Sequence, residues 1–282
     1  MPKILLRRVI TPDPSAGHTH TIIFLHGRGD TAGEFAHKFQ EWTDSKGRNL
    51  CKLFPSVKWV FPWCKKRPAV ADNGAPWSQW FDVWDSTDFS DHEEVQAKGL
   101  RESIVNIRNI IKPEARLLGG RWDRVILAGV SQGGATSVHT LLNLVASSGS
   151  PRRLGALMAF CCRMPFPGRT LAETRAAVGL VETDEVPADD EMIRNTPVLL
   201  QHNRDDEIVR VEDGRELRDT LRRFGATVTW QEYPSGGHWL HEPKGVEDVA
   251  AWLTKYVFNP AARRESLASK KKGDTISGNY LI

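Results

Sequence analysis

Residues 124–134 constrain this chain most, because an apolar run there leads directly into a glycine-flanked serine. The segment reads Arg-Val-Ile-Leu-Ala-Gly-Val-Ser-Gln-Gly-Gly and contains the pattern G-x-S-x-G around Ser131. Where this pattern joins a strand to a helix, the serine stands on a sharp turn with its hydroxyl exposed. Gly129 and Gly133 lack Cβ atoms, which allows strained torsions and close approach. The pattern therefore predicts that Ser131 is a nucleophile.

Strand-like and helix-like segments alternate along most of the sequence. Strands are predicted at residues 21–25, 57–61, 125–130, 154–162, 197–201 and 227–233, and helices at 31–44, 93–111, 133–146, 211–224 and 245–257. This alternation favours right-handed βαβ units, and therefore an α/β fold with a mostly parallel central sheet and helices on both faces. No internal repeat interrupts it.

The length and composition favour a single domain. The chain has 282 residues, 40% of them hydrophobic, which is enough to bury a substantial core. We expect the domain to cover residues 1–260. Residues 173–195 form an acidic stretch without clear periodicity, expected to be a surface insertion or the edge of a lid. Residues 261–282 are polar and predict a flexible tail.

Charge and cysteine usage limit the partners of the chain. Its 38 basic and 35 acidic residues are mixed along the sequence and give a net charge of +3, which offers no case for nucleic acid. The four cysteines lack metal-ligand spacing, and Cys161 and Cys162 are expected to be buried thiols, so neither a metal nor a cofactor is predicted. No apolar run is long enough for a membrane span or a secretory signal, which favours the cytoplasm. A homodimer is compatible with the sequence but not required by it.

A carboxylate for the catalytic machinery is expected after the strand at 197–201. The chain continues there with His-Asn-Arg-Asp-Asp, which ends at Asp206. A carboxylate in this place can orient an imidazole and stabilise the imidazolium that forms during catalysis. Asp206 is the first choice and Asp205 the second, and a solvated loop charge is the alternative for either.

The histidine that would act as the base is expected after the strand at 227–233. His238 directly follows Gly236 and Gly237, which let the loop fold back over the sheet. His241 remains an alternative, either as the base or as a helix cap. His18 and His20 are interpreted as a strand-edge pair rather than as a metal site.

An oxyanion formed by attack on an acyl carbon needs two fixed donors. The backbone amide of Gln132 is expected to be the first. The second is expected in the loop His26-Gly-Arg-Gly-Asp30, where the glycines let the amide of Arg28 turn inward. His26 would then brace that loop.

Several motifs occur here in one order: His-Gly-Arg-Gly-Asp at 26–30, Trp-Phe-Asp at 80–82, Gly-Val-Ser-Gln-Gly-Gly at 129–134, the Asp206 loop and Gly-His at 237–238. Together they resemble the acyl-protein thioesterase, lysophospholipase and small carboxylesterase family of α/β-hydrolases. The resemblance covers roughly residues 20–257 and implies a triad of Ser131, Asp206 and His238, with cofactor-free hydrolysis of esters or thioesters.

The sequence departs from this family at three places, of which one is the long interval between Ser131 and Asp206 that the stretch 173–195 produces. Asn203 stands where the family's H-G-x-x-D motif has glycine, which leaves the shape of that loop open. Residue 2 is proline, whereas mammalian-type members carry a cysteine near the amino terminus that can be lipidated.

The substrate is the least determined part of the prediction. Contacts are expected from the aromatic residues Trp77, Trp80, Phe81 and Trp239, with core packing as the rival interpretation. Lys65, Lys66 and Arg67 in the same region favour a polar or anionic leaving group.

Three functions are compatible with these motifs. The leading one is a serine esterase or thioesterase that acts on small-molecule or acylated-protein substrates through an acyl-enzyme. The second keeps the triad but uses a specialised small-molecule ester or thioester. The third is a binding protein that retains only the fold.

Overall fold

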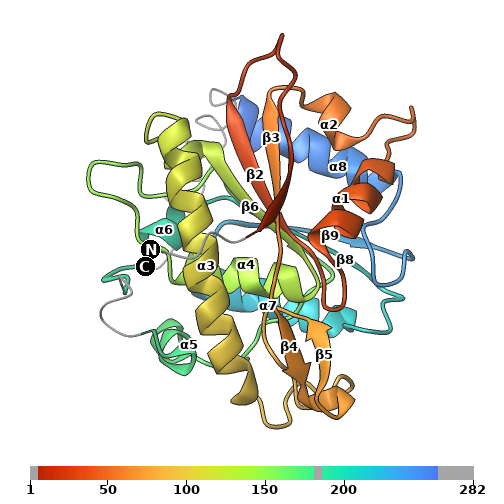
Figure 1. Ribbon diagram of the computed structural model, residues 1–282, viewed down its shortest axis with the longest axis vertical. Coiled ribbons are helices and arrows are strands. Elements are labelled where there is room, and N and C mark those ends of the chain that lie inside the picture. Colours follow the sequence, from red (N-terminus) through yellow and green to blue (C-terminus); the bar gives the residue numbers. More distant parts are fainter. Residues whose placement is uncertain (1–5, 181–185, 260–282) are drawn as a thin grey trace, which may run out of the picture.

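The computed structural model describes residues 6–180 and 186–259 and is built around a central sheet (Figure 1). The sheet has seven strands in the order β1-β3-β2-β6-β7-β8-β9. They are β1 (Arg7–Ile10), β2 (His20–Leu25), β3 (Val57–Pro62), β6 (Val125–Val130), β7 (Ala156–Phe160), β8 (Val198–Asn203) and β9 (Val228–Tyr233). Only β1 is antiparallel to its neighbour, so the predicted mostly parallel sheet is confirmed.

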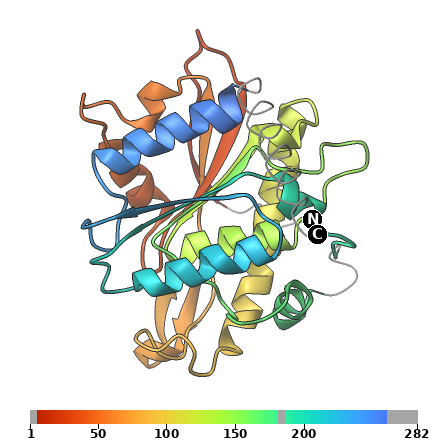
Figure 2. The ribbon, with the colours of Figure 1, turned by 180° about the vertical axis from the view of Figure 1, so that it is seen from behind.

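Helices cover both faces of this sheet, as Figure 2 shows from behind. The helices are α1 (Ala32–Glu41), α2 (Leu50–Leu53), α3 (Val95–Leu117), α4 (Gln132–Leu142), α5 (Leu171–Val178), α6 (Glu191–Asn195), α7 (Val211–Arg223) and α8 (Lys244–Leu253). One buried cluster joins the sheet to α3, α4 and α7, and a second joins the opposite face to α1, α2 and α8.

The side-chain alternation of β2 shows how the sheet separates these two clusters. Ile23 and Leu25 belong to the first cluster, whereas Ile22 and Phe24 belong to the second. All four are at most 1% exposed. A parallel strand covered on both faces reads as a continuous apolar run, which is why this segment lacks polar alternation.

The parallel arrangement brings the loops of the site to one edge. The loops that follow β2, β6, β7, β8 and β9 all leave from the same end of the sheet, because these strands run in one direction. A hairpin of β4 (Lys66–Ala69) and β5 (Ala75–Ser78) lies beyond this edge (Figure 1). Ligand sites of open α/β sheets occur at such edges.

Most predicted elements are confirmed, and the exceptions are short. β1 has the sequence Arg-Arg-Val-Ile, and only its antiparallel pairing with β3 makes it a strand. The stretch 173–195, expected to lack regular structure, includes most of α5 and all of α6, while 181–185 lie outside the described residues. The predicted tail at 261–282 also lies outside them. Within 6–180 and 186–259, no helix is long and apolar enough to cross a membrane.

Candidate active site

Ser131 stands on a strained turn between β6 and α4. Its φ is 53° and its ψ −124°, a conformation that side-chain-bearing residues rarely adopt. The Ser131 amide donates a hydrogen bond of 2.9 Å to the carbonyl of Phe160, the last residue of β7. Neighbouring structure therefore holds the strain, as is common where a side chain is presented for chemistry.

Two glycines make this turn sterically possible. A Cβ on Gly129 would lie 2.3 Å from the carbonyl carbon and oxygen of Gly133. A Cβ on Gly133 would lie 2.4 Å from the carbonyl oxygens of both Leu25 and His26. Backbone thus packs against backbone where the end of β2 meets the turn. The close approach that the sequence analysis expected at these two glycines is therefore found.

The predicted acid and base are in direct contact. His238 Nδ1 lies 2.8 Å from Asp206 Oδ2 and 3.0 Å from Oδ1. The Asp206 side chain is fully buried, whereas that of His238 is 23% exposed. With Nδ1–H donated to the carboxylate, the lone pair of Nε2 is available to accept a proton.

Asp206 is held in its ionised form by its surroundings. Burial opposes the charge, but hydrogen bonds from His202 and His238 and the nearby His238 charge outweigh burial and hold the pKa of the carboxyl well below its usual range. The amides of Ile208 and Val209 also donate to Oδ1, at 3.0 and 2.9 Å. His202 Nε2 also contacts Oδ2, at 3.2 Å.

Asp205, the second choice for the acid, has a different position. Its carboxylate accepts hydrogen bonds from the amides of Gly236 and Gly237, at 3.1 and 2.8 Å. It therefore braces the loop that carries His238 and does not contact the imidazole.

Asn203, the departure from the family's glycine, also braces this loop. Its Nδ2 donates to the carbonyls of Gly237 and Trp239, at 2.8 and 2.6 Å, on either side of His238. The side chain is buried, and a Cβ on Gly236, whose φ is 139°, would lie within 2.7 Å of it. The sequence left the shape of this loop open. Its only sign of the bracing role was an asparagine side chain at the position where the family has glycine.

The alternative histidines lie in other surroundings. His241 stacks on the ring of Tyr233 with centroids 4.4 Å apart. His18 contacts Thr21, and His20 contacts Thr19 and packs edge-on against Phe258. Among the described residues, none of these histidines contacts Asp206.

Ser131 and His238 line one cavity of about 650 Å³ at the carboxyl edge of the sheet. Trp77, Phe81 and Gln132 contribute to the same wall. In the described part of the chain no hydrogen bond joins Ser131 to His238, and such contacts often tighten only when substrate is bound.

The two predicted oxyanion donors also lie at this cavity. Gln132 is the first residue of α4, so its amide has no acceptor within the helix. Its side chain accepts from the Trp80 amide and donates to the Phe81 carbonyl, both at 2.8 Å, which locks the start of the helix.

Arg28 is held by the β4–β5 hairpin. Its Nε donates to Gln79 at 3.0 Å, it pairs with Asp72, and its guanidinium lies 4.7 Å from the Trp77 ring. These contacts hold the Arg28 side chain against the hairpin, and both Arg28 and Ser131 line the cavity.

Two of the four aromatic residues predicted to contact the substrate line the cavity, and two do not. Trp77 and Phe81 line the cavity, but Trp80 and Trp239 are not among its lining residues. Trp80 is 1% exposed and donates Nε1–H to the His26 carbonyl at 2.8 Å. Trp239 packs edge-on against Trp42, 5.3 Å between centroids. For Trp80 and Trp239 the structure therefore favours the packing interpretation.

Two other expected features lie away from this cavity. Lys65 and Arg67 pair with Glu102 at 3.3 and 3.1 Å, and neither they nor Lys66 line it. No described residue of 173–195 lines it either, and the role of this stretch as a lid edge stays a prediction.

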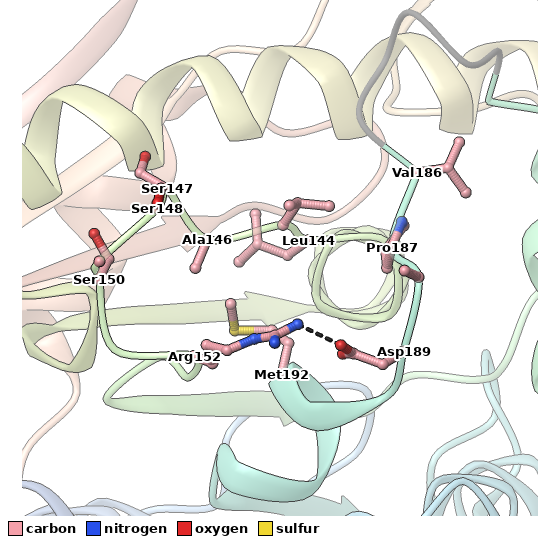
Figure 3. Close-up of a pocket in the computed structure, with 13 residues that line it drawn as sticks. Leu144, Ala146, Ser147, Ser148, Ser150, Arg152, Val186, Pro187, Asp189 and Met192 are labelled. Atoms are coloured by element: carbon pink, nitrogen blue, oxygen red, sulfur yellow. Dashed lines mark hydrogen bonds and ion pairs between the residues drawn. The ribbon is translucent and has the colours of Figure 1, made fainter.

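A second cavity, of about 380 Å³, lies between the loop after α4 and the segment before α6 (Figure 3). Its polar lining includes Ser147, Ser148 and Ser150, and Arg152, which pairs with Asp189 (Figure 3). Among its described lining residues there is no histidine that could activate these serines as nucleophiles.

Comparison with known proteins identifies the family of this chain. Residues 7–257 match the family model described as phospholipase/carboxylesterase. Acyl-protein thioesterase 1 of Gibberella zeae is 30% identical over 242 residues, which cover 84% of this chain and 91% of that protein. The carboxylesterase SOBER1 of Arabidopsis thaliana is 26% identical over 234 residues, or 83% of this chain and 89% of that one.

Solved structures show the same fold. The crystal structure of Zea mays acyl-protein thioesterase 2 has a TM-score of 0.66 at 23% identity and covers 89% of this chain and 99% of its own. The fold is that of an α/β-hydrolase. The chain belongs to the phospholipase/carboxylesterase family, and it is a serine hydrolase of carboxylic ester or thioester bonds.

Proposed function

We propose that Ser131, His238 and Asp206 are the catalytic triad of this hydrolase. One observation carries the proposal: His238 Nδ1 contacts both carboxylate oxygens of the buried, ionised Asp206. The same histidine lines a cavity together with the strained Ser131. Nucleophile, base and orienting carboxylate then have the roles that acyl transfer requires.

The reaction follows from these positions. As Ser131 Oγ attacks the acyl carbon, its proton passes to His238 Nε2, and Asp206 stabilises the resulting imidazolium. The same proton then goes to the departing alcohol or thiol, which leaves an acyl-serine. Water loses a proton to His238 as it attacks this acyl group. His238 then returns a proton to Ser131 Oγ as the bond to the acyl carbon breaks, which releases the carboxylic acid and free Ser131.

The backbone amides of Arg28 and Gln132 are proposed to bind the oxyanion. Gln132 offers the free amide of a helix start, and Arg28 belongs to a loop tied down by Asp72 and Gln79. Donors fixed before the reaction need no reorganisation, which is why loss of one slows such enzymes about 100- to 1,000-fold.

The substrate is proposed to be an acyl ester or thioester, either small or attached to a protein. Relatives named acyl-protein thioesterase support the acylated protein. A specialised small-molecule substrate is the second candidate, and it is favoured by the charged side chains that line the cavity, among them Arg163, Asp213 and Glu216. Trp77 and Phe81 are proposed to contact the substrate from the wall beside Ser131.

A fluorophosphonate probe tests the triad directly. Wild type should be labelled, whereas Ser131→Ala and His238→Ala should not. His241→Ala is the matched control, since this second histidine lies against Tyr233, and it should keep its labelling. Labelling of Ser131→Ala, or loss of labelling in His241→Ala equal to that in His238→Ala, would contradict the assignment.

A substrate screen then separates the two candidate substrates. p-Nitrophenyl esters and acyl thioesters of increasing chain length should give one optimum, long for an acyl-protein thioesterase and short for a small-molecule enzyme. The cytoplasmic location and the homodimer remain predictions, to be checked by imaging of a tagged chain and by light scattering.

A further inference from the structure

Arg163 is a buried cation that the proposed chemistry does not use. It follows β7 by three residues, at the same sheet edge as Ser131 and His238, and lines the cavity with them. The residue is only 9% exposed. Burial lowers the pKa of its guanidinium to about 10, which still leaves it charged at neutral pH.

The side chain is held in place from two sides. Its Nη2 donates to Oε1 of the buried Gln96 at 2.9 Å, and its Cζ lies 4.0 Å from the centre of the Phe89 ring. Gln96 in turn donates to the Phe89 carbonyl at 3.3 Å. The guanidinium is therefore fixed before any ligand binds, as a recognition group should be.

Arg163 lacks the partner that a buried charge normally has. Across the described residues no carboxylate lies within ion-pair distance of it, and Asp213 and Glu93 act on its charge only from farther away. Its hydrogen bond within this part of the chain is the one from Nη2 to Gln96, so Nε and Nη1 have no acceptor there. The other two arginines of this cavity are paired, Arg28 with Asp72 and Arg210 with Asp213 at 3.8 Å. A buried cation without a directly bonded counter-ion is unfavourable, and its free donors are available for an anion brought by a ligand.

We propose that Arg163 binds a carboxylate carried by the substrate, so that the enzyme prefers ester or thioester substrates with this group to neutral ones of the same length. The inference rests on the proposed function, because the cavity is the one that contains Ser131. A guanidinium fork matches the two oxygens of a carboxylate.

The rest of the cavity favours a carboxylate over a phosphate. Four acidic residues also line it, namely Asp88, Glu207, Asp213 and Glu216. A dianion entering this space meets about twice the repulsion of a monoanion. The single charge of a carboxylate is therefore the better fit to one fixed guanidinium.

Matched substrates test the preference. On the acyl side, mono-4-nitrophenyl adipate is compared with its terminal amide. On the leaving-group side, S-butanoyl 3-mercaptopropanoate is compared with the corresponding amide. We expect wild type to favour the carboxylate in one of these pairs by roughly 10- to 100-fold in kcat/KM, the effect of a charged hydrogen bond. The pair that responds identifies the side that carries the charge.

Substitutions of Arg163 connect the preference to this residue. Arg163→Gln should bring the kcat/KM ratio close to one, and Arg163→Lys, which keeps the charge without the fork, should give an intermediate ratio. Arg152→Gln removes an equal charge outside this cavity and should keep the wild-type ratio. Should Arg163→Gln fail to fold, Arg163→Lys carries the test, and a wild-type ratio in it would overturn the proposal.

Binding to Ser131→Ala separates this inference from the proposed function. Calorimetric Kd values for the same pairs should favour the carboxylate about tenfold without turnover. Equal Kd values for the carboxylate and its amide would overturn the anion site, even if the wild-type enzyme is active. Turnover that depends on Ser131 but shows no preference for the carboxylate would contradict the Arg163 site and support the triad. A preference for the carboxylate with turnover that does not depend on Ser131 would contradict only the triad. Tighter binding of propylphosphonate than of butanoate would also overturn the choice of a carboxylate.

Discussion

The nucleophile half of the site, at the ends of β2 and β6, is shaped by residues without side chains, whereas the base half, at the ends of β8 and β9, is held by polar side chains. In the first half, Gly129 and Gly133 let two backbones meet. In the second, Asn203, Asp205 and Asp206 hold the His238 loop through hydrogen bonds. The first half should therefore be sensitive to added side-chain volume, and the second to the loss of hydrogen-bonding groups.

The largest effect is expected in the base half, from Asp206→Asn. Loss of the carboxylate removes the group that orients His238 and stabilises its charge, so kcat should fall about 10³- to 10⁴-fold. Asp205→Asn is the matched control, because Asp205 contacts only the loop amides, and it should lose less than about tenfold. Steady-state kinetics of both variants compare the two acids. Equal losses would remove the distinction between them.

Gly133→Ala tests the nucleophile half. Its Cβ would meet two carbonyl oxygens at 2.4 Å, which a backbone shift must relieve. We expect the free energy of unfolding to fall by about 1–3 kcal/mol. The shift should also lower kcat about 100-fold, since a displacement near 1 Å has that effect.

Gly33→Ala in α1 is the control for this substitution. The nearest atom to its new Cβ is 4.0 Å away, so we expect a gain of about 0.5–1 kcal/mol and unchanged kcat. Urea denaturation and kinetics measure both quantities. A Gly133→Ala variant as stable and active as wild type would show that the turn at Ser131 does not need the space that Gly133 leaves.

Asn203→Ala tests the polar support of the His238 loop. The Gly237 carbonyl would lose its donor, whereas the Trp239 carbonyl would keep a contact from Cys161 at 3.2 Å. We expect kcat to fall roughly tenfold, the effect of one hydrogen bond, with KM within twofold.

Asn49→Ala provides the comparison for Asn203→Ala. It removes the cap of α2, far from the triad in sequence and contacts, and should cost about 1 kcal/mol of stability without changing kcat. A rise in KM at constant kcat for Asn203→Ala would mean that this residue acts on substrate binding instead.

The smallest effect concerns Glu232 on β9. Hydrogen bonds from Arg215 outweigh burial and, with those from Arg204, lower the pKa of Glu232 to about 2. A lowered pKa stabilises the fold above the unfolded pKa of about 4.3, and this stabilisation is lost as the pH falls toward 2.

Glu232→Gln should therefore be less stable than wild type near pH 7, by under about 1 kcal/mol for a pair near solvent. The difference in Tm should shrink between pH 4.5 and 2. A constant difference over that range would show that packing, rather than charge, connects β9 to α7.

The fold was largely predictable because its strands and helices have clear periodicity. The segment at 125–130 reads as a strand and that at 211–224 as a helix, and both are found within one residue of these bounds. β1 and the β4–β5 hairpin were missed, because pairing partners distant in sequence decide such short strands.

The residues of the candidate site were also predicted in part from the sequence and in part not. The motif predicted the Ser131 turn from its glycines, and order along the chain predicted Asp206 and His238. The contact of Trp80 with the His26 carbonyl, and the packing of Trp239 against Trp42, were decided by burial that no local pattern records.

The sheet, the sterically required glycines and the order of the proposed nucleophile, acid and base follow from the sequence, because they depend on local backbone geometry and on the direction of parallel strands. The contact of Asp206 with His238, the support of its loop by Asn203 and Asp205, and the place of Arg163 in the cavity depend on the folded chain. Side-chain burial and hydrogen bonding join residues far apart in the chain, so they emerge only when the strands are assembled.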